Sequence, residues 1–90
     1  SRITCKPNPF SNEMTLTMQL KNGQHISVEV YDVRGSKIKT LLNSDLPEGY
    51  YEVEWKGDND TGTKVKEGIY FYKISTGKGT EITDKIVKIK

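Results

Sequence analysis

The sequence contains a single cysteine, Cys5, so no disulfide can form within the chain and its fold must rely on packing alone. No apolar run approaches the roughly 20 residues that cross a bilayer, and the chain does not open like a signal peptide. Lys and Arg number 14 against 12 Asp and Glu. The resulting net charge of +2 is too small and too evenly spread to indicate a nucleic-acid partner.

The chain is also short, with 90 residues that predict one domain, residues 1–90. A chain of this size buries only roughly 60 to 65% of the surface that its unfolded form exposes, which leaves little room for a deep active-site cleft. Because the first residue is Ser1 and not Met, we expect the domain to be a fragment of a larger protein.

Helical periodicity is absent, because no segment keeps its apolar residues at a spacing near 3.6. Apolar and polar residues alternate instead, as they do in half-buried strands. Turn-forming residues recur about every 8 to 12 positions, the spacing of an antiparallel sandwich. We therefore predict an all-β, antiparallel β-sandwich of about seven strands, over residues 14–20, 26–30, 38–42, 50–55, 64–66, 68–76 and 82–90.

The alternation also predicts which side chains form the core and how two strands are joined. One consistent inner face contains Leu16, Met18, Ile26, Val28, Val30, Ile38, Val53, Trp55, Tyr70, Tyr72, Val87 and Ile89. Asn22-Gly23 is a strong hairpin signal and predicts that residues 14–20 and 26–30 pair with each other. Pro7 and Pro9 cannot donate ladder hydrogen bonds, so the chain should turn or follow an edge there.

Candidate catalytic and metal-binding residues are few. His25 and Cys5 are the only residues of their types and lack the motif of a nucleophile pair, so we expect a histidine at a strand entry, an edge thiol and no enzymatic activity. Asp58, Asp60 and Gly62 resemble the start of a calcium loop, but the Gly and Glu that an EF-hand requires at its sixth and twelfth positions are absent. We predict a turn with no metal or cofactor, and a weak irregular calcium site remains the alternative.

The aromatic residues admit two interpretations. They could form the packed inner faces of the sandwich or a flat platform on which sugars stack. Alternation favours packing for Tyr51, Trp55, Tyr70 and Tyr72. Tyr50 and Phe71 point the other way, which keeps a sugar-binding patch as an alternative.

The order of five short motifs is more specific than any one of them. They are Pro7-Asn8-Pro9-Phe10, residues 28–35 (VEVYDVRG), Trp55-Lys56-Gly57-Asp58 with Asp60 and Gly62, residues 68–72 (GIYFY) and residues 85–90 (KIVKIK). In this order they resemble the type A C-terminal sorting domain of the type IX secretion system. Residues 28–72 are also similar to the immunoglobulin-like domain of the flagellar hook-capping protein.

The resemblance implies a seven-stranded, immunoglobulin-like sandwich at the C-terminal end of an exported cargo protein. An outer-membrane translocon would recognise it, and a cell-surface sortase could then cut it off, so the protein would be secreted or displayed on the cell surface. The domain itself would be non-catalytic. One departure is Lys56, where many members have Asp, which makes a loop-bound cation less expected.

The resemblance assigns roles to individual positions. The family motif positions are Pro7, Asn8, Pro9, Asp32, Gly35, Gly68 and Tyr70, and the translocon would recognise Lys85, Ile86, Val87, Lys88, Ile89 and Lys90. A terminal strand with a free edge could offer backbone groups to a receptor, with Val87 and Ile89 in pockets and Lys85 and Lys88 facing an acidic rim. The alternatives are a structural spacer of the hook-capping type and a carbohydrate-binding accessory module of a secreted enzyme.

Overall fold

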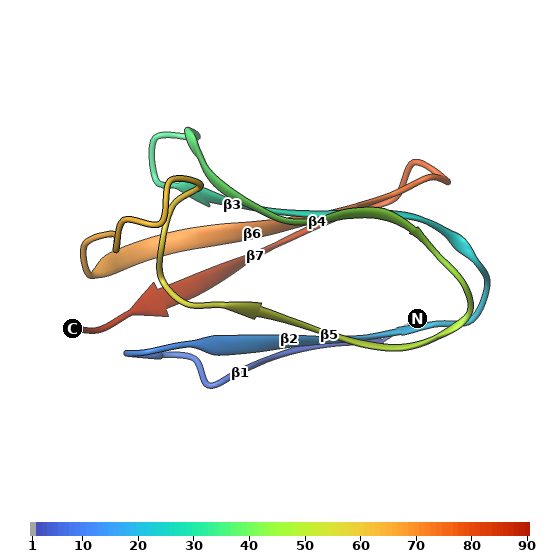
Figure 1. Cartoon of the computed structure of the whole chain (residues 1–90), viewed down its shortest axis with the longest axis horizontal. Coiled ribbons are helices and arrows are strands. Elements are labelled where there is room, and N and C mark those ends of the chain that lie inside the picture. The colour runs from blue at the N-terminus through green and yellow to red at the C-terminus, as the bar shows by residue number, and fades with distance from the viewer. Residues whose placement is uncertain (1) are drawn as a thin grey trace.

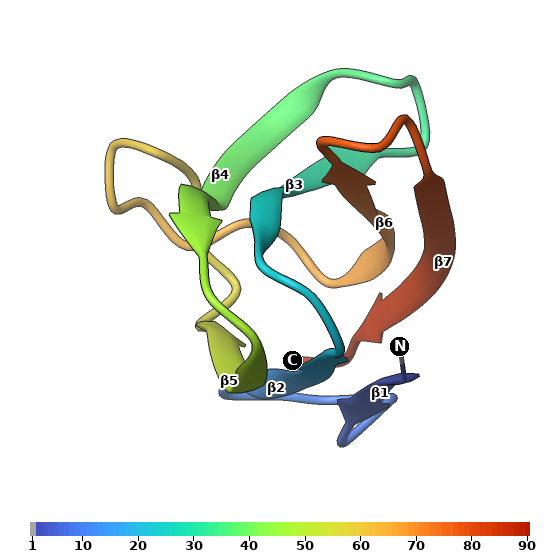
Figure 2. The same cartoon turned by 90° about the vertical axis from the view of Figure 1, so that its right-hand side faces the viewer.

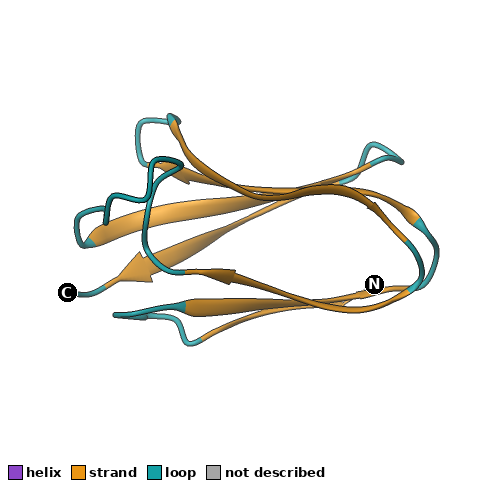
Figure 3. Cartoon of the chain, viewed as in Figure 1, coloured by secondary structure: helices purple, strands orange, loops and turns teal. Residues whose placement is uncertain are grey.

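Two antiparallel sheets pack face to face in the computed structural model, which describes residues 2–90 (Figure 1). One sheet has the strand order β1-β2-β5 and the other β4-β3-β6-β7. The strands are β1 (Arg2–Lys6), β2 (Met14–Leu20), β3 (Gln24–Asp32), β4 (Lys37–Leu46), β5 (Gly49–Trp55), β6 (Gly68–Thr76) and β7 (Glu81–Lys88). All the remaining described residues are loops and turns (Figure 3), so no helix in this part of the chain could span a membrane. The predicted all-β sandwich of seven strands is confirmed.

The core lies between the sheets and is built from alternate residues of β2, β3 and β6. Buried and half-buried residues alternate along the whole of β2. Of the predicted inner-face residues, those that are buried are Leu16, Met18, Ile26, Val28, Val30, Trp55, Tyr70 and Tyr72. Phe10, Met14, Leu20, Ile74 and Ile86 complete the core. Turned by 90°, the sandwich shows β4 and β5 along one side and β7 and β1 along the other (Figure 2).

Several details of the sequence prediction are wrong. Ile38 and Val53 are only half-buried, because they lie on β4 and β5, each of which has a neighbouring strand on one side only. Residues 64–66 do not form a strand and contribute only an isolated bridge between Asp58 and Lys64. The total of seven is reached because Arg2–Lys6, which were not predicted to be a strand, form β1. This strand pairs with β2 before the prolines interrupt the ladder.

The predicted hairpin at Asn22-Gly23 is also absent. β2 lies between β1 and β5, whereas β3 belongs to the other sheet, so the connection crosses the sandwich. Both sides of β2 are already paired, and β3 therefore could not join it. Gly23 also has no positive φ, which the favoured two-residue hairpin turn would require.

Candidate recognition site

The sequence motifs gather at one end of the sandwich. The loop after β1, the β3–β4 turn, the loop between β5 and β6 and the C-terminus all lie at the end marked C in Figure 1. They contain the Pro-Asn-Pro motif, the Asp32–Gly35 turn, the acidic loop and the terminal lysine-rich segment. Residues far apart in sequence are therefore neighbours here, and we describe this end as the candidate recognition site.

The N-terminal motif binds the edge of the terminal strand directly. Asn8 Nδ2 donates a hydrogen bond to the carbonyl of Lys85 at 3.0 Å, and Asn8 Oδ1 accepts one from the N–H of Val87 at 2.9 Å. The backbone N–H of Phe10 donates to the carbonyl of Val87 at 3.0 Å, and the N–H of Ile89 donates to the carbonyl of Phe10 at 2.7 Å. We call residues 8–10 the clasp.

The clasp overturns the expectation of a free terminal edge. β7 pairs with β6 on its other side, where Gly68 lies opposite Lys88. Between Lys85 and Ile89 the outer backbone groups of the strand already bond to the clasp. The N–H of Lys90 donates to Glu67 Oε2 at 3.0 Å, which attaches the chain end as well. A receptor cannot add a strand here while the clasp is in place.

The register of the terminal strand is also opposite to the prediction. Ile86 is fully buried and Lys88 is 7% exposed, whereas Ile89 is 51% exposed and Val87 is half-buried. Ile86 lies opposite the inward-facing Tyr70, so pairing with β6 fixes which residues face the core. In the segment KIVKIK, apolar residues occur at both the odd-numbered and the even-numbered positions. Alternation alone therefore could not decide which set faces the core.

Lys88 fits against the core because residue 57 is glycine. A Cβ added at Gly57 would lie 2.6 Å from Cε of Lys88 and 3.6 Å from the Phe10 ring. Gly57 is itself buried and has a φ of 70°, a conformation that favours glycine. The aliphatic part of Lys88 therefore packs as an apolar side chain. A turn-forming role for Gly57 is predictable from its place in the Trp55-Lys56-Gly57-Asp58 motif, but its contact with the last strand has no local sequence signal.

An aromatic cluster lies beneath the clasp. The ring centroids of Phe10 and Trp55 are 5.3 Å apart, and Trp55 meets Tyr70 edge-on, also at 5.3 Å. Trp55 Nε1 donates to the carbonyl of Asp58 at 2.8 Å, and the Tyr70 hydroxyl donates to the carbonyl of Lys66 at 2.6 Å. Burial is the main cause of the raised pKa of Tyr70, and the negative charge of Asp32 adds to it. The cluster attaches the clasp to the core.

The Asp32–Gly35 motif forms a tight turn at the same end. Asp32 Oδ1 accepts hydrogen bonds from the backbone N–H groups of Arg34 at 2.9 Å and Ser36 at 3.0 Å. Gly35 adopts a φ of 85°. Asp32 and Tyr70 are register partners in β3 and β6, so this turn adjoins the aromatic cluster.

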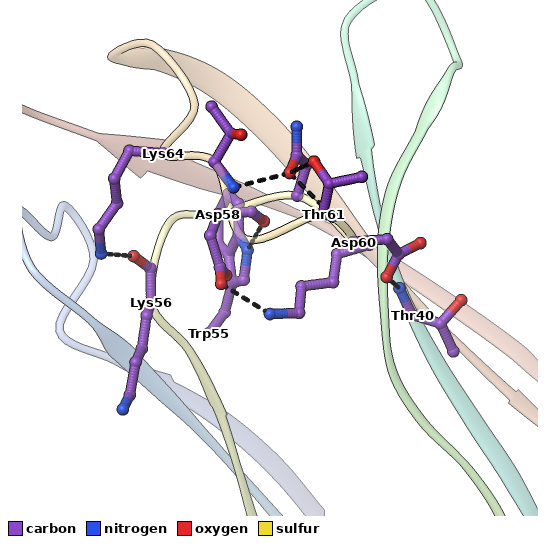
Figure 4. Close-up of polar contacts among 10 residues, drawn as sticks. Thr40, Trp55, Lys56, Asp58, Asp60, Thr61 and Lys64 are labelled. Atoms are coloured by element: carbon purple, nitrogen blue, oxygen red, sulfur yellow. Dashed lines mark hydrogen bonds and ion pairs between the residues drawn. The ribbon is translucent and has the colours of Figure 1, made fainter.

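The acidic loop is held by its own side chains and by β4 (Figure 4). Asp58 Oδ2 pairs with Lys39 Nζ at 2.8 Å, and Asp60 Oδ1 accepts from the Thr40 N–H at 3.2 Å. Asn59 Oδ1 accepts from the N–H groups of Thr61 and Thr63. Within residues 2–90 no group of three or more His, Cys, Asp or Glu side chains could hold a metal ion. These contacts fit a structural turn.

Cys5 and His25 lie in separate sheets, on β1 and β3. Cys5 Sγ is 3.2 Å from Met14 Sδ, and burial, with a smaller effect of Asp84, raises the pKa of the thiol. His25 Nδ1 lies 2.7 Å from Asp45 Oδ1 and Nε2 lies 2.6 Å from Asn43 Oδ1. Both contacts raise the pKa of His25, and the hydrogen bond to Asp45 has the larger effect. The structure does not bring the two side chains together.

The aromatic residues do not form an exposed pair in the described part of the chain. Tyr50 is 73% exposed, but Trp55, Tyr70 and Tyr72 are buried. Tyr31 and Phe71 are cross-strand partners and only half-exposed. The packing interpretation therefore holds for Trp55, Tyr70 and Tyr72, and the half-buried Tyr51 packs against the same core.

Comparison with protein families gives a match over most of the chain. Residues 3–80 match the family model described as the FlgD Ig-like domain. No curated protein matches the sequence significantly. The immunoglobulin-like fold that the resemblance implied is therefore supported.

Solved structures share this fold at low sequence identity. Dimeric latent PorU from Porphyromonas gingivalis superimposes with a TM-score of 0.77 at 20% identity, over 97% of this chain and 9% of that chain. PorZ, an essential bacterial surface component of the type-IX secretion system of P. gingivalis, superimposes with a TM-score of 0.64 at 17% identity, over 98% of this chain and 11% of the PorZ chain. FlgD from P. aeruginosa superimposes with a TM-score of 0.65 at 16% identity, over 94% of this chain and 71% of the FlgD chain. The chain thus spans about a tenth of PorU and of PorZ.

Proposed function

The chain belongs to the FlgD Ig-like domain family, and we propose that it is the sorting domain of an exported protein, recognised by the type IX secretion machinery. One observation carries this proposal. The motifs that resemble a sorting domain meet around the terminal segment, where the clasp binds the last strand, Lys88 packs against Gly57, and the Phe10 ring packs on Trp55.

The similarity to PorZ supports the secretion context. PorZ is a surface component of the type-IX system, and a domain of the present fold makes up part of it. We infer that the present chain belongs to a protein that reaches the cell surface or the medium. Its partners would be an outer-membrane translocon and a surface sortase, with the cargo attached covalently to it. The domain performs no chemistry of its own in this proposal.

A structural spacer or assembly module is the second candidate function. It is favoured by the family match and by the likeness to FlgD from P. aeruginosa, of which this chain spans 71%. A spacer would require the folded sandwich but would not depend on the identity of the exposed side chains in residues 85–90. The two functions therefore differ in what they require of residues 85–90.

The test is a fusion of residues 1–90 to a periplasm-directed reporter in a host with the secretion system. The fusion should reach the cell surface, and export should fall when the exposed Ile89 and Lys90 are both replaced by Ser. Replacing the exposed Lys21 and Lys78, which lie outside the terminal segment, is the matched control. A folded intact domain that leaves the reporter in the periplasm would refute the proposal and leave the spacer.

Lys88 and the terminal deletion are poor probes of recognition. Lys88 is almost fully buried, so its replacement also changes core packing. Deleting residues 86–90 removes the buried Ile86 together with the partners of the clasp. Loss of export in either variant would therefore not separate recognition from folding.

A further inference from the structure

The two outer faces of the sandwich differ in character. On the three-stranded sheet, the outward residues of β2 and β5 are Thr15, Thr17, Gln19, Tyr50, Glu52 and Glu54, mostly polar or acidic. On the four-stranded sheet, the residues next to the terminal segment are mainly apolar, and Lys85 is the basic residue among them, whereas Lys73 is paired with Glu81. We call Val33, Ile69, Phe71 and Val87 the outer strip.

The strand register makes the outer strip continuous. Ile86 and Lys88 face the core, so Val87 faces outward, where it lies opposite Ile69. Phe71 follows on β6, opposite Lys85 on one side and Tyr31 on the other. Ile69 is 45% and Val33 is 67% exposed. Contiguous exposed apolar residues on a small domain are typical of interaction surfaces.

A shallow hollow extends the strip toward the β3–β4 turn. Its volume is about 360 Å³, and it is lined by Tyr31, Asp32, Val33, Gly35, Phe71, Lys73 and Thr83. Lys73 Nζ lies 5.6 Å from the centroid of the Tyr31 ring and 3.6 Å from Glu81 Oε2. An apolar side chain of a partner could enter this hollow.

The charge of the surrounding residues defines the complementary partner. Lys85 lies beside Phe71 and makes no ion pair with any residue in the described range 2–90. An exposed cation next to an apolar strip is complemented by a carboxylate next to apolar side chains. Because the clasp occupies the edge of β7 from Lys85 to Ile89, a partner that recognises the folded domain must contact side chains there.

We propose that the outer strip and Lys85 form the docking surface for the secretion partner, a protein surface that presents apolar side chains beside a carboxylate. This inference rests on the proposed sorting function and specifies which face of the domain is recognised. Val87 and Lys85 of the terminal segment act together with Ile69 and Phe71 of β6. The identity of the last residues then matters because they complete a composite surface.

Surface display of the reporter fusion tests this surface. Ile69→Thr and Val87→Thr keep a β-branched side chain suited to a strand while removing apolar contact. Together they should lower export by about tenfold, as expected when hot-spot contacts are lost. Lys85→Glu should also lower it, because it repels the partner's carboxylate. The matched controls are Tyr50→Thr on the other outer face and Lys78→Glu in the β6–β7 turn, both exposed, and each should change export less than about twofold.

The outcomes separate this inference from the proposed function. If the intact fusion is not exported, the sorting function itself fails. If the intact fusion is exported and the folded strip variants are exported equally well, the docking surface is refuted while the function stands. Higher export after Asn8→Ala, with no effect of the strip variants, would instead indicate recognition of the backbone edge. A purified domain that is dimeric and becomes monomeric with Val87→Thr would reassign the strip to self-association.

Discussion

The side-chain oxygen of Asn8 accepts a hydrogen bond from the backbone N–H of Val87, which joins residues 79 positions apart. The side-chain amide of Asn8 also donates a hydrogen bond to the carbonyl of Lys85. One side chain thus supplies two of the hydrogen bonds that a neighbouring strand would make. Asn8→Ala should cost about 1–3 kcal/mol of unfolding free energy, the sum of two such bonds. Denaturant unfolding measures this. Asn22→Ala, at an exposed position in the β2–β3 connection, should change it by less than about 0.5 kcal/mol. Equal effects would refute a structural role for the clasp.

Gly57 and Lys88 should show energetic coupling. Gly57→Ala introduces strain at a φ of 70° and a contact of 2.6 Å with Lys88 Cε. Gly62→Ala shares the strain at a φ of 86° but meets no atom within 4 Å, so it should cost only about 1–2 kcal/mol. The extra cost at Gly57 should disappear in a Lys88→Ala background. A double-mutant cycle that gives a coupling below about 0.5 kcal/mol would contradict this prediction and show that the end of the Lys88 side chain moves away from residue 57 at little cost.

The parts of the fold set by local alternation could be predicted from sequence. Residues 14–20 and 68–76 alternate so regularly that their inward faces were identified correctly. The Asn22-Gly23 hairpin failed because the choice of partner strand depends on which edges other strands already occupy. Residues 85–90 could be assigned to either register, and only the pairing of β7 with β6 decides between them.

The arrangement of the candidate recognition site could be predicted only in part. The motifs around Asn8 and residues 85–90 were identified, but their mutual contact was not. A side-chain amide that pairs with a strand 77 to 79 positions away leaves no periodic signal in the sequence. The outer strip was not predicted from the sequence, because the prediction placed Val87 in the core. Burial of Lys88 was unexpected because lysine seldom lies inside a protein.

His25 should make stability depend on pH. Both ring nitrogens face oxygen acceptors, Asp45 Oδ1 and Asn43 Oδ1, and only the protonated ring can donate to both. Its folded pKa is therefore raised above 6.5. The stabilising contribution is fully present below the unfolded pKa and is lost as the pH rises through the folded pKa. The difference in melting temperature between the parent domain and His25→Gln should thus be larger at pH 5.5 than at pH 9. A difference that does not change with pH would contradict this pairing.

Calcium should leave the melting temperature nearly unchanged. The Asp58 carboxylate already pairs with Lys39, and Asp60 Oδ1 bonds to the backbone of Thr40. A cation that used these two oxygens would have to displace both contacts, which leaves Asp58 Oδ1 as the one buried oxygen without a hydrogen-bond partner in the described residues. A melting temperature that rises with calcium concentration as mass action requires would instead establish a binding site. Asp58→Asn should then abolish that rise.

Trp55 connects the clasp, the acidic loop and β6, so its truncation should have the largest effect. Trp55→Ala should cost about 3–5 kcal/mol, because the ring is fully buried between Phe10 and Tyr70. Trp55→Phe keeps a ring but loses the Nε1 hydrogen bond to Asp58, and should cost about 1–3 kcal/mol. Tyr50→Ala, at a side chain that is 73% exposed, is the control and should change stability by less than about 0.5 kcal/mol. Denaturant unfolding of the three variants provides the comparison. If Trp55→Ala were as mild as Tyr50→Ala, the ring would lie at the surface and a sugar platform would again be the better interpretation.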